Sequence, residues 1–302
     1  MTASSPDRND RSVLATPRDL LRYGVSRFNA AGLCFGHGSD NAYDEAAYLV
    51  LHALHLPPDT LEPFLDARLL PQEREQVLAL LERRVRERLP APYLTGEAWL
   101  RGHRFRVDPR VIVPRSPIAG LLEDGLAPWV EADAVRDALD MCTGSGCLAV
   151  LAALAFGQAR VDAADCSAGA LEVAAANVAD YGLQARVALH RSDLFGQLPP
   201  RRYDVIVCNP PYVNAASMDA LPPEYRHEPA LALAGGADGM DLVRRILRDA
   251  PAFLQPAGVL VLEIGHEREH FERAFPGLEP VWLETEGGRD HVLLLARGQL
   301  AP

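Results

Sequence analysis

Four residues that can hold an amino or amide group stand together at the end of an apolar run: Asn209, Pro210, Pro211 and Tyr212 follow YDVIVC. Proline cannot donate to a sheet, so the two prolines must lie beyond the strand, where they hold the backbone extended. The side-chain oxygen of Asn209 and the carbonyl of Pro210 can then accept both hydrogens of one NH2 group, and the ring of Tyr212 offers it a flat face. These residues predict a clamp for a planar amine or amide.

Such a clamp suits methyl transfer to nitrogen. An amide nitrogen is a weak nucleophile because its lone pair is delocalised into the carbonyl. Two acceptors would raise the electron density on the nitrogen and aim it at a methyl donor, so the contribution is positioning and electrostatics. No strong base is needed, since the proton becomes acidic as the new bond forms and leaves to water. The competing interpretation of NPPY is a rigid corner between a strand and a loop.

A glycine-containing turn precedes this motif in the chain. In DMCTGSGCLA, which begins at Asp140, Gly144 and Gly146 lie between a predicted strand and a predicted helix. Glycines there allow positive φ and a close approach of the backbone to a ligand. Asp165 follows Gly144 by 21 residues, at the end of the next predicted strand. An acid at about this distance can accept both hydroxyls of a ribose.

The next predicted strand ends in RSDLF, which places Asp193 on the same edge as Asp165. A carboxylate there can accept from an adenine amine, although a turn or helix cap is an equally ordinary role for it. The pattern GxGxxA also satisfies a dinucleotide fingerprint, so NAD stays open. At three successive strand ends the sequence offers a glycine turn, an acid that can accept from ribose and an acid that can accept from adenine. This order favours an adenosyl ligand, and S-adenosylmethionine fits it without a pyrophosphate site.

From Arg136 onward, short apolar runs alternate with helical or loop segments, which predicts a doubly wound parallel sheet. In such sheets ligands bind beyond the carboxyl ends of the strands, where the motifs above are expected. The segment VWLETEGGRDHVLLLAR predicts two strands joined by a Gly-Gly turn, the last of them antiparallel. Before this region, helical periodicity predicts a helical domain over 1–90, to which we assign binding of the protein substrate. Alternating, β-branched residues predict a linking β-hairpin over 91–115, and the sheet domain then covers 116–302.

The composition narrows the function classes. All 30 basic residues are arginines, which excludes P-loop NTPases and enzymes that need a Schiff-base lysine. The net charge of −11 argues against tight binding of nucleic acid and favours a basic protein partner. Five cysteines without a CxxC pair predict a cytoplasmic protein. The longest apolar runs are about half the ~20 residues that a membrane span needs.

The segments DMCTGSGCLA, DAADCS, RSDLF, NPPYV and YRHEPALALAGGADG together resemble the protein-glutamine methyltransferase family, along nearly the whole chain. VPRSPIAGLLEDG and YRHEP are most similar to the branch that modifies the third large-subunit ribosomal protein. The resemblance implies a Rossmann-like class I methyltransferase fold with a seven-stranded, mainly parallel α/β sheet and an antiparallel last strand. It also implies S-adenosylmethionine as cofactor and a glutamine side-chain amide in a ribosomal protein as methyl acceptor.

By matching position, the resemblance implies roles for individual residues. It assigns the amide to the four residues of NPPY and implies no metal. Cys142 departs from the wider methyltransferase pattern, where a glycine is common, and we expect its φ to stay negative. The predicted cofactor set is Asp140, Thr143, Gly144, Gly146, Asp165, Asp193 and Asn209.

Other interpretations remain. NPPY would clamp an adenine amine of a nucleic acid equally well, a release factor is an alternative protein substrate, and a noncatalytic adaptor is a third possibility. HEREH, from His266 to His270, formally matches the HExxH zinc-protease motif, with Glu284 and Glu286 as candidate third ligands. We expect His227 to be structural, Glu263 to bind nearby backbone, and the loop from residue 225 to 239 to form the outer wall of the substrate pocket.

Overall fold

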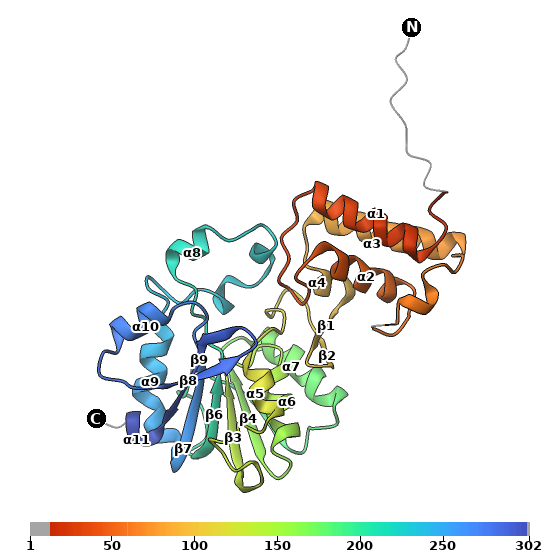
Figure 1. Ribbon diagram of the computed structural model, residues 1–302. Coiled ribbons are helices and arrows are strands. Elements are labelled where there is room, and N and C mark those ends of the chain that lie inside the picture. Colours follow the sequence, from red (N-terminus) through yellow and green to blue (C-terminus); the bar gives the residue numbers. More distant parts are fainter. Residues whose placement is uncertain (1–12, 59, 301–302) are drawn as a thin grey trace. The chain divides into compact units, whose positions relative to one another are not determined.

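The computed structural model describes residues 13–58 and 60–300 (Figure 1). The chain divides into two compact units, one ending at Thr95 and the other beginning at Gly96. Residues 1–12 of the predicted N-terminal domain lie outside the described residues. Within the described ranges, no helix is both long enough and apolar enough to cross a membrane.

The N-terminal unit is helical, as its periodicity predicts. Thr16 and Asn41 cap the first two helices by accepting from backbone N–H groups, which satisfies donors that a helix start leaves free. Leu20, Phe28 and Leu49 are fully buried in its core. The elements are α1 (Pro17–Ala30), α2 (Ala42–Ala53), η2 (Glu62–Phe64), α3 (Pro71–Glu87) and α4 (Ala91–Thr95).

A short β-hairpin opens the second unit, with β1 (Glu97–Leu100) paired antiparallel to β2 (His103–Arg106). Residues 91–95, which the sequence places in the hairpin segment, instead form α4. The reason is local: the N–H groups of Tyr93 and Leu94 both donate to the carbonyl of Pro90, which starts a helical turn. A proline in the first turn is tolerated because its missing N–H would have no helical partner there.

The main sheet has seven strands in the order β5-β4-β3-β6-β7-β9-β8. The first five are parallel, and β9 is antiparallel to both of its neighbours, which confirms the predicted fold class. Strand order reverses between β4 and β6, on either side of β3. The strands are β3 (Asp137–Met141), β4 (Arg160–Asp165), β5 (Val187–Arg191), β6 (Tyr203–Cys208), β7 (Leu254–Glu263), β8 (Val281–Thr285) and β9 (Gly288–Ala296).

Helices cover both faces of this sheet (Figure 1). Successive residues of β6 alternate between the two cores: Val205 and Val207 pack with one set of helices, Ile206 and Cys208 with the other. A strand buried on both faces explains why its sequence is continuously apolar. One face carries α5 (Ile118–Glu123), α6 (Cys147–Ala155) and α7 (Ala168–Asp180); the other carries α9 (Asp241–Phe253), α10 (Arg268–Ala274) and α11 (Arg297–Leu300).

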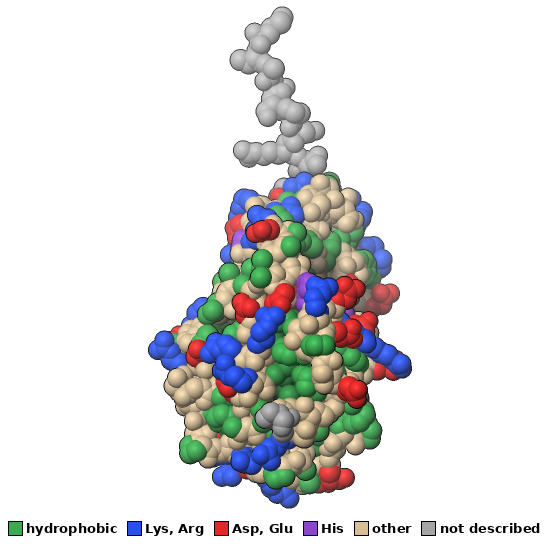
Figure 2. Space-filling model, turned by 90° about the vertical axis from the view of Figure 1, so that its left-hand side faces the viewer, with side chains coloured by type: hydrophobic (Ala, Val, Ile, Leu, Met, Phe, Trp, Pro, Cys, Tyr) green, Lys and Arg blue, Asp and Glu red, His purple; other side chains and the backbone are tan. Residues whose placement is uncertain are grey.

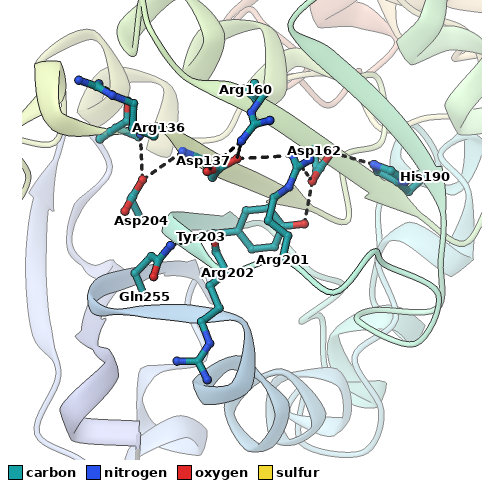
Figure 3. A network of polar contacts seen from close by, with 11 residues as sticks. Arg136, Asp137, Arg160, Asp162, His190, Arg201, Arg202, Tyr203, Asp204 and Gln255 are labelled. Carbon is teal, nitrogen blue, oxygen red and sulfur yellow. Dashed lines mark hydrogen bonds and ion pairs between the residues drawn. The ribbon is translucent and has the colours of Figure 1, made fainter.

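Polar residues join the amino ends of the strands (Figure 3). Asp162 on β4 is buried and accepts from the Tyr203 hydroxyl at 2.8 Å and from Arg201 at 3.1 Å, and its other oxygen lies 2.8 Å from the ring of His190. On β6, Asp204 accepts from the backbone N–H groups of residues 136 and 137. Asp162 therefore joins β4 to β5 and β6, and Asp204 joins β6 to the start of β3.

Candidate active site

The turn after β3 bends through three left-handed residues. Cys142, Gly144 and Gly146 have φ values of 62°, 54° and 78°. The expectation of a negative φ at Cys142 is therefore wrong. Hydrogen bonds on both sides of the turn impose its path: Thr143 N–H donates to Ala164 and Gly146 N–H to Thr143, each at 2.9 Å. A non-glycine residue in this conformation costs roughly 1–2 kcal/mol, which these bonds offset.

The two glycines of the turn have different surroundings. A Cβ added to Gly146 would lie 3.0 Å from the Cβ of Ala174, so this glycine lets α7 pack against the turn. A Cβ added to Gly144 would meet no atom within 4 Å. Gly144 instead borders a cavity, and its missing side chain leaves room for a ligand.

Asp140 and Thr143 lie beneath the turn and are buried. The Thr143 hydroxyl donates to Asp140 at 2.5 Å, and burial raises the pKa of Asp140 to about 7. Neither is among the described residues that line the cavity, so in this geometry they support the turn from below.

The cavity lies at the carboxyl ends of β3 to β6 and has a volume of about 470 Å³. Its lining includes Gly144, Asp165, Asp193 and Asn209, so the structure brings together residues that the sequence proposed separately. Sequence reasoning missed another wall, Arg110 to Ile112, because nothing in that segment indicates that it folds over the sheet. The apolar walls include Val111, Ile112, Pro229, Leu231, Ala232 and Leu242.

Among the described residues, the hydrogen-bond partners of the Asp165 carboxylate are backbone N–H groups. Its two oxygens accept from the N–H groups of Gly144 and Ser167, each at 2.9 Å, and burial raises its pKa. Because each carboxylate oxygen has two lone pairs, the side facing the cavity can still accept from a ligand. Asp193 is more exposed and forms an ion pair with Arg245 at 2.8 Å, at the rim of the same cavity.

The NPPY segment lies between two cavities. Asn209 and Pro211 line the cavity described above, and Pro210 is buried between them. Tyr212 lines a second cavity of about 490 Å³, and its hydroxyl donates to Glu263 at 2.9 Å. Glu263 also accepts from the side chain of Ser116 at 2.5 Å, so its partners within the described part of the chain are side chains and not the expected backbone groups. Burial raises the pKa of Glu263 to about 7.

The loop from residue 225 to 239 contributes Pro229, Leu231 and Ala232 to the cavity that Gly144 and Asp165 also line. Its role as the outer wall of the substrate pocket stays a prediction. Glu228 is buried and anchors it, accepting from Arg115 at 2.6 Å and 2.8 Å and from the N–H of Val113 at 2.9 Å. His227 is not among the described residues lining either cavity. Arg115 and Glu228 are thus further residues that sequence reasoning missed.

The HEREH segment does not have the geometry of a zinc motif. His266 lies before α10 and its Nδ1 is 3.1 Å from the ring of His291, whereas His270 bonds to Glu267. Glu267 also accepts from the side chain of Asn214 at 2.7 Å. Among residues 13–58 and 60–300, no group of three or more His, Cys, Asp or Glu side chains could hold a metal ion.

Known proteins share this fold. Residues 124–221 match the family described as the methyltransferase small domain. The solved structure of the hMettl16 catalytic domain in complex with MAT2A 3′UTR hairpin 1 gives a TM-score of 0.51 at 17% identity, over 83% of this chain and 90% of that one. With the strand order and the cavity at its reversal point, these findings define a Rossmann-like class I methyltransferase.

Bacterial relatives narrow the class. The ribosomal protein uL3 glutamine methyltransferase of Bordetella pertussis is 72% identical over 293 residues, which covers 97% of this chain and 98% of the relative. The protein of the same name from Neisseria meningitidis serogroup B is 58% identical, over 95% of each chain. The chain belongs to the ribosomal protein uL3 glutamine methyltransferase family. The predicted resemblance to the ribosomal-protein branch is therefore confirmed.

Proposed function

We propose that this protein transfers a methyl group from S-adenosylmethionine to the side-chain amide nitrogen of a glutamine in ribosomal protein uL3. Its family membership supports the reaction and the substrate. The observation that carries the proposal is the meeting of Asn209 with Gly144, Asp165 and Asp193 at one cavity. The lining of that cavity combines the side chain of Asn209, which can accept from an amide, with a backbone turn and carboxylates that can hold an adenosyl group.

The cavity fits the cofactor. The open space at Gly144 admits a ligand against the backbone, and Asp165 has acceptor capacity left for ribose hydroxyls. The apolar walls suit an adenine ring, with Asp193 at the rim as acceptor for its amine. Asp140, Thr143 and Gly146 would act on the cofactor through the shape of the turn. When bound, the cofactor supplies a methyl group on a sulfonium, which leaves as a neutral thioether.

The NPPY residues would prepare the acceptor. The Asn209 side-chain oxygen and the Pro210 carbonyl accept the two amide hydrogens, which raises electron density on the nitrogen and fixes its direction. Pro210 and Pro211 keep these acceptors in place without reorganisation. Tyr212 provides the face on which the planar amide lies. The proton that the nitrogen loses leaves to water.

Charge favours a basic partner. Residues 91–302 carry 28 acidic residues and 19 arginines. On the face shown in Figure 2, the described basic and acidic side chains are interspersed rather than gathered by sign, unlike the cationic face that tight nucleic-acid binding uses.

We assign residues 1–90 to substrate binding, 91–115 to a link and 116–302 to catalysis. All five cysteines are free thiols, which accords with a reducing, cytoplasmic setting.

The decisive test of the reaction is incubation with tritiated cofactor and separated substrates. We expect label on uL3, with mass spectrometry placing one methyl group on a glutamine side chain. Label on a release factor or on nucleic acid instead would replace the proposed substrate. Binding of cofactor without transfer to any of the three would replace the proposed activity by an adaptor role.

The absence of lysine permits a clean test of the partner interface. A carbodiimide joins carboxylates to amines, so any link from a side-chain amine must come from the substrate. We expect links from uL3 lysines to acids of the N-terminal unit. Links confined to residues 116–302 would contradict the role assigned to residues 1–90.

A further inference from the structure

Tyr212 is enclosed by three glycines that leave no room for a side chain. A Cβ at Gly235 would lie 2.7 Å from the Cα of Tyr212, and one at Gly239 would overlap its carbonyl oxygen. A Cβ at Gly265 would overlap the ring itself. Gly239 and Gly265 also have positive φ, at 79° and 53°. The backbone and one edge of the ring are therefore fixed by close packing.

The free end of the Tyr212 ring is held by a buried chain of hydrogen bonds. Its hydroxyl donates to Glu263, the last residue of β7, at 2.9 Å. The second oxygen of Glu263 accepts from Ser116 at 2.5 Å, and only 5% of this glutamate is exposed. Glu263 thus connects Tyr212 to the segment that leads into α5.

We propose that Glu263 is a positioning residue: its carboxylate aligns Tyr212 with the substrate amide, so that methyl transfer requires Glu263 to be ionised. This inference rests on the proposed function. An ionised carboxylate accepts from both hydroxyls at once. A carboxylic acid must donate through one oxygen, so the bond on the protonated side has to break or reverse. Where that side faces Tyr212, its hydroxyl loses the acceptor that holds it, and the ring is then held only by its packing against the glycines.

The ionisation falls in an accessible pH range. Burial raises the pKa of Glu263 to about 7, although the two hydroxyls and Arg115 act to lower it. His291 is a second group nearby with a shifted pKa, which burial and the neighbouring His266 lower. The charged or titratable groups that face Glu263 or share its cavity are Arg101, Arg115, Asp124, Cys208, Tyr212, His266, Glu284, Glu286 and His291.

The first test is the pH dependence of kcat for methylation of uL3 at saturating cofactor. A pKa of 7 makes the ionised fraction rise about tenfold between pH 6 and pH 8, and we expect wild-type kcat to follow it. Glu263→Gln should lower kcat at pH 8 about tenfold, remove the slope, and leave the cofactor Kd within twofold. His291→Gln and His266→Gln serve as controls and should keep the slope. A slope that survives Glu263→Gln, or disappears with His291→Gln, would overturn the proposal.

The second test does not depend on activity. Carbon-13 at Cζ of the 8 tyrosines gives NMR signals that report hydroxyl hydrogen bonding, and Tyr212→Phe identifies the signal of Tyr212. In the wild type, we expect the Tyr212 signal to shift with pH, with a midpoint near pH 7. In Glu263→Gln the Tyr212 signal should not change with pH. The signals of the other seven tyrosines should be the same in both proteins, which shows that the variant is folded. A constant signal in the wild type would overturn the proposal. A titrating signal in a protein that leaves uL3 unmethylated would support the coupling and refute the proposed substrate.

Discussion

Two aspartates on one strand show how the two ends of the sheet differ. Asp162, near the amino end of β4, receives its bonds from the side chains of His190, Arg201 and Tyr203. Asp165, three residues later, receives its bonds from backbone N–H groups and borders a cavity. The same residue type thus closes the structure at one end and leaves it open to a ligand at the other.

The difference follows from the topology. At the amino end, long side chains from neighbouring strands and loops converge on Asp162 and surround it (Figure 3). At the carboxyl end, the chain turns sharply into helices on opposite faces, and the turns present N–H groups and glycines instead of long side chains. A carboxylate held by backbone keeps its outer lone pairs for a ligand. We therefore expect the kind of hydrogen-bond partner to distinguish an aspartate that holds the fold from one that can bind a ligand.

The largest expected effect is on the rate of methyl transfer, and it comes from a comparison of two residues at opposite ends of β6. Asn209→Ala should lower methyl transfer at least about 100-fold, because one of the two acceptors for the amide is lost. Its cofactor Kd should change only a few-fold. Asp204→Asn, at the amino end of the same strand, should lower stability and keep transfer. Near-normal turnover of uL3 by Asn209→Ala would refute the clamp.

Substitution of the two aspartates of β4 should have different effects, one on cofactor binding and the other on stability. Asp165→Ala should weaken cofactor binding by about 1.5 to 3 kcal/mol, since a carboxylate that bonds ribose hydroxyls is removed. Asp162→Asn should instead lower the free energy of unfolding by about 2 kcal/mol, because Arg201 loses a charged acceptor. Calorimetric titration and urea denaturation of both variants measure the two effects. Unchanged cofactor binding in Asp165→Ala would remove the ribose assignment.

A pair of glycines separates backbone strain from contact with a ligand. Gly144 and Gly182 have similar φ values, 54° and 66°, and an added Cβ meets no atom within 4 Å at either site. Alanine at each should therefore cost a similar ~1 kcal/mol of stability. Only Gly144→Ala should also weaken cofactor binding, by roughly tenfold, because its Cβ enters the cavity. Equal cofactor affinities in the two variants would place the ligand away from the turn.

The last effect depends on pH and concerns the support beneath the turn. Burial raises the pKa of Asp140 to about 7, so between its ordinary value and 7 the folded state binds more protons than the unfolded state. Stability from this group is therefore present at low pH and lost as pH rises through 7. Asp140→Asn should remove a slope of at most about 1.4 kcal/mol per pH unit from the unfolding free energy. Identical slopes in both proteins would contradict the role of Asp140.

Much of this molecule could be predicted from local pattern. Continuous apolar runs identified the parallel strands, and two prolines after Asn209 marked the carboxyl end of β6, because proline excludes strand pairing. Long-range packing could not be read in this way. The left-handed φ of Cys142 is imposed by bonds to a neighbouring strand. The partners of Glu263 lie 147 and 51 residues away in the chain.

The central claim is that the carboxyl end of the sheet holds the cofactor with its reactive end toward Asn209. A crystal structure with S-adenosylhomocysteine tests it most directly. We expect the ligand in the cavity beside Gly144, with its ribose hydroxyls on Asp165 and its sulfur directed toward Asn209. A ligand bound outside this cavity, or bound with its sulfur turned away from Asn209, would contradict the account.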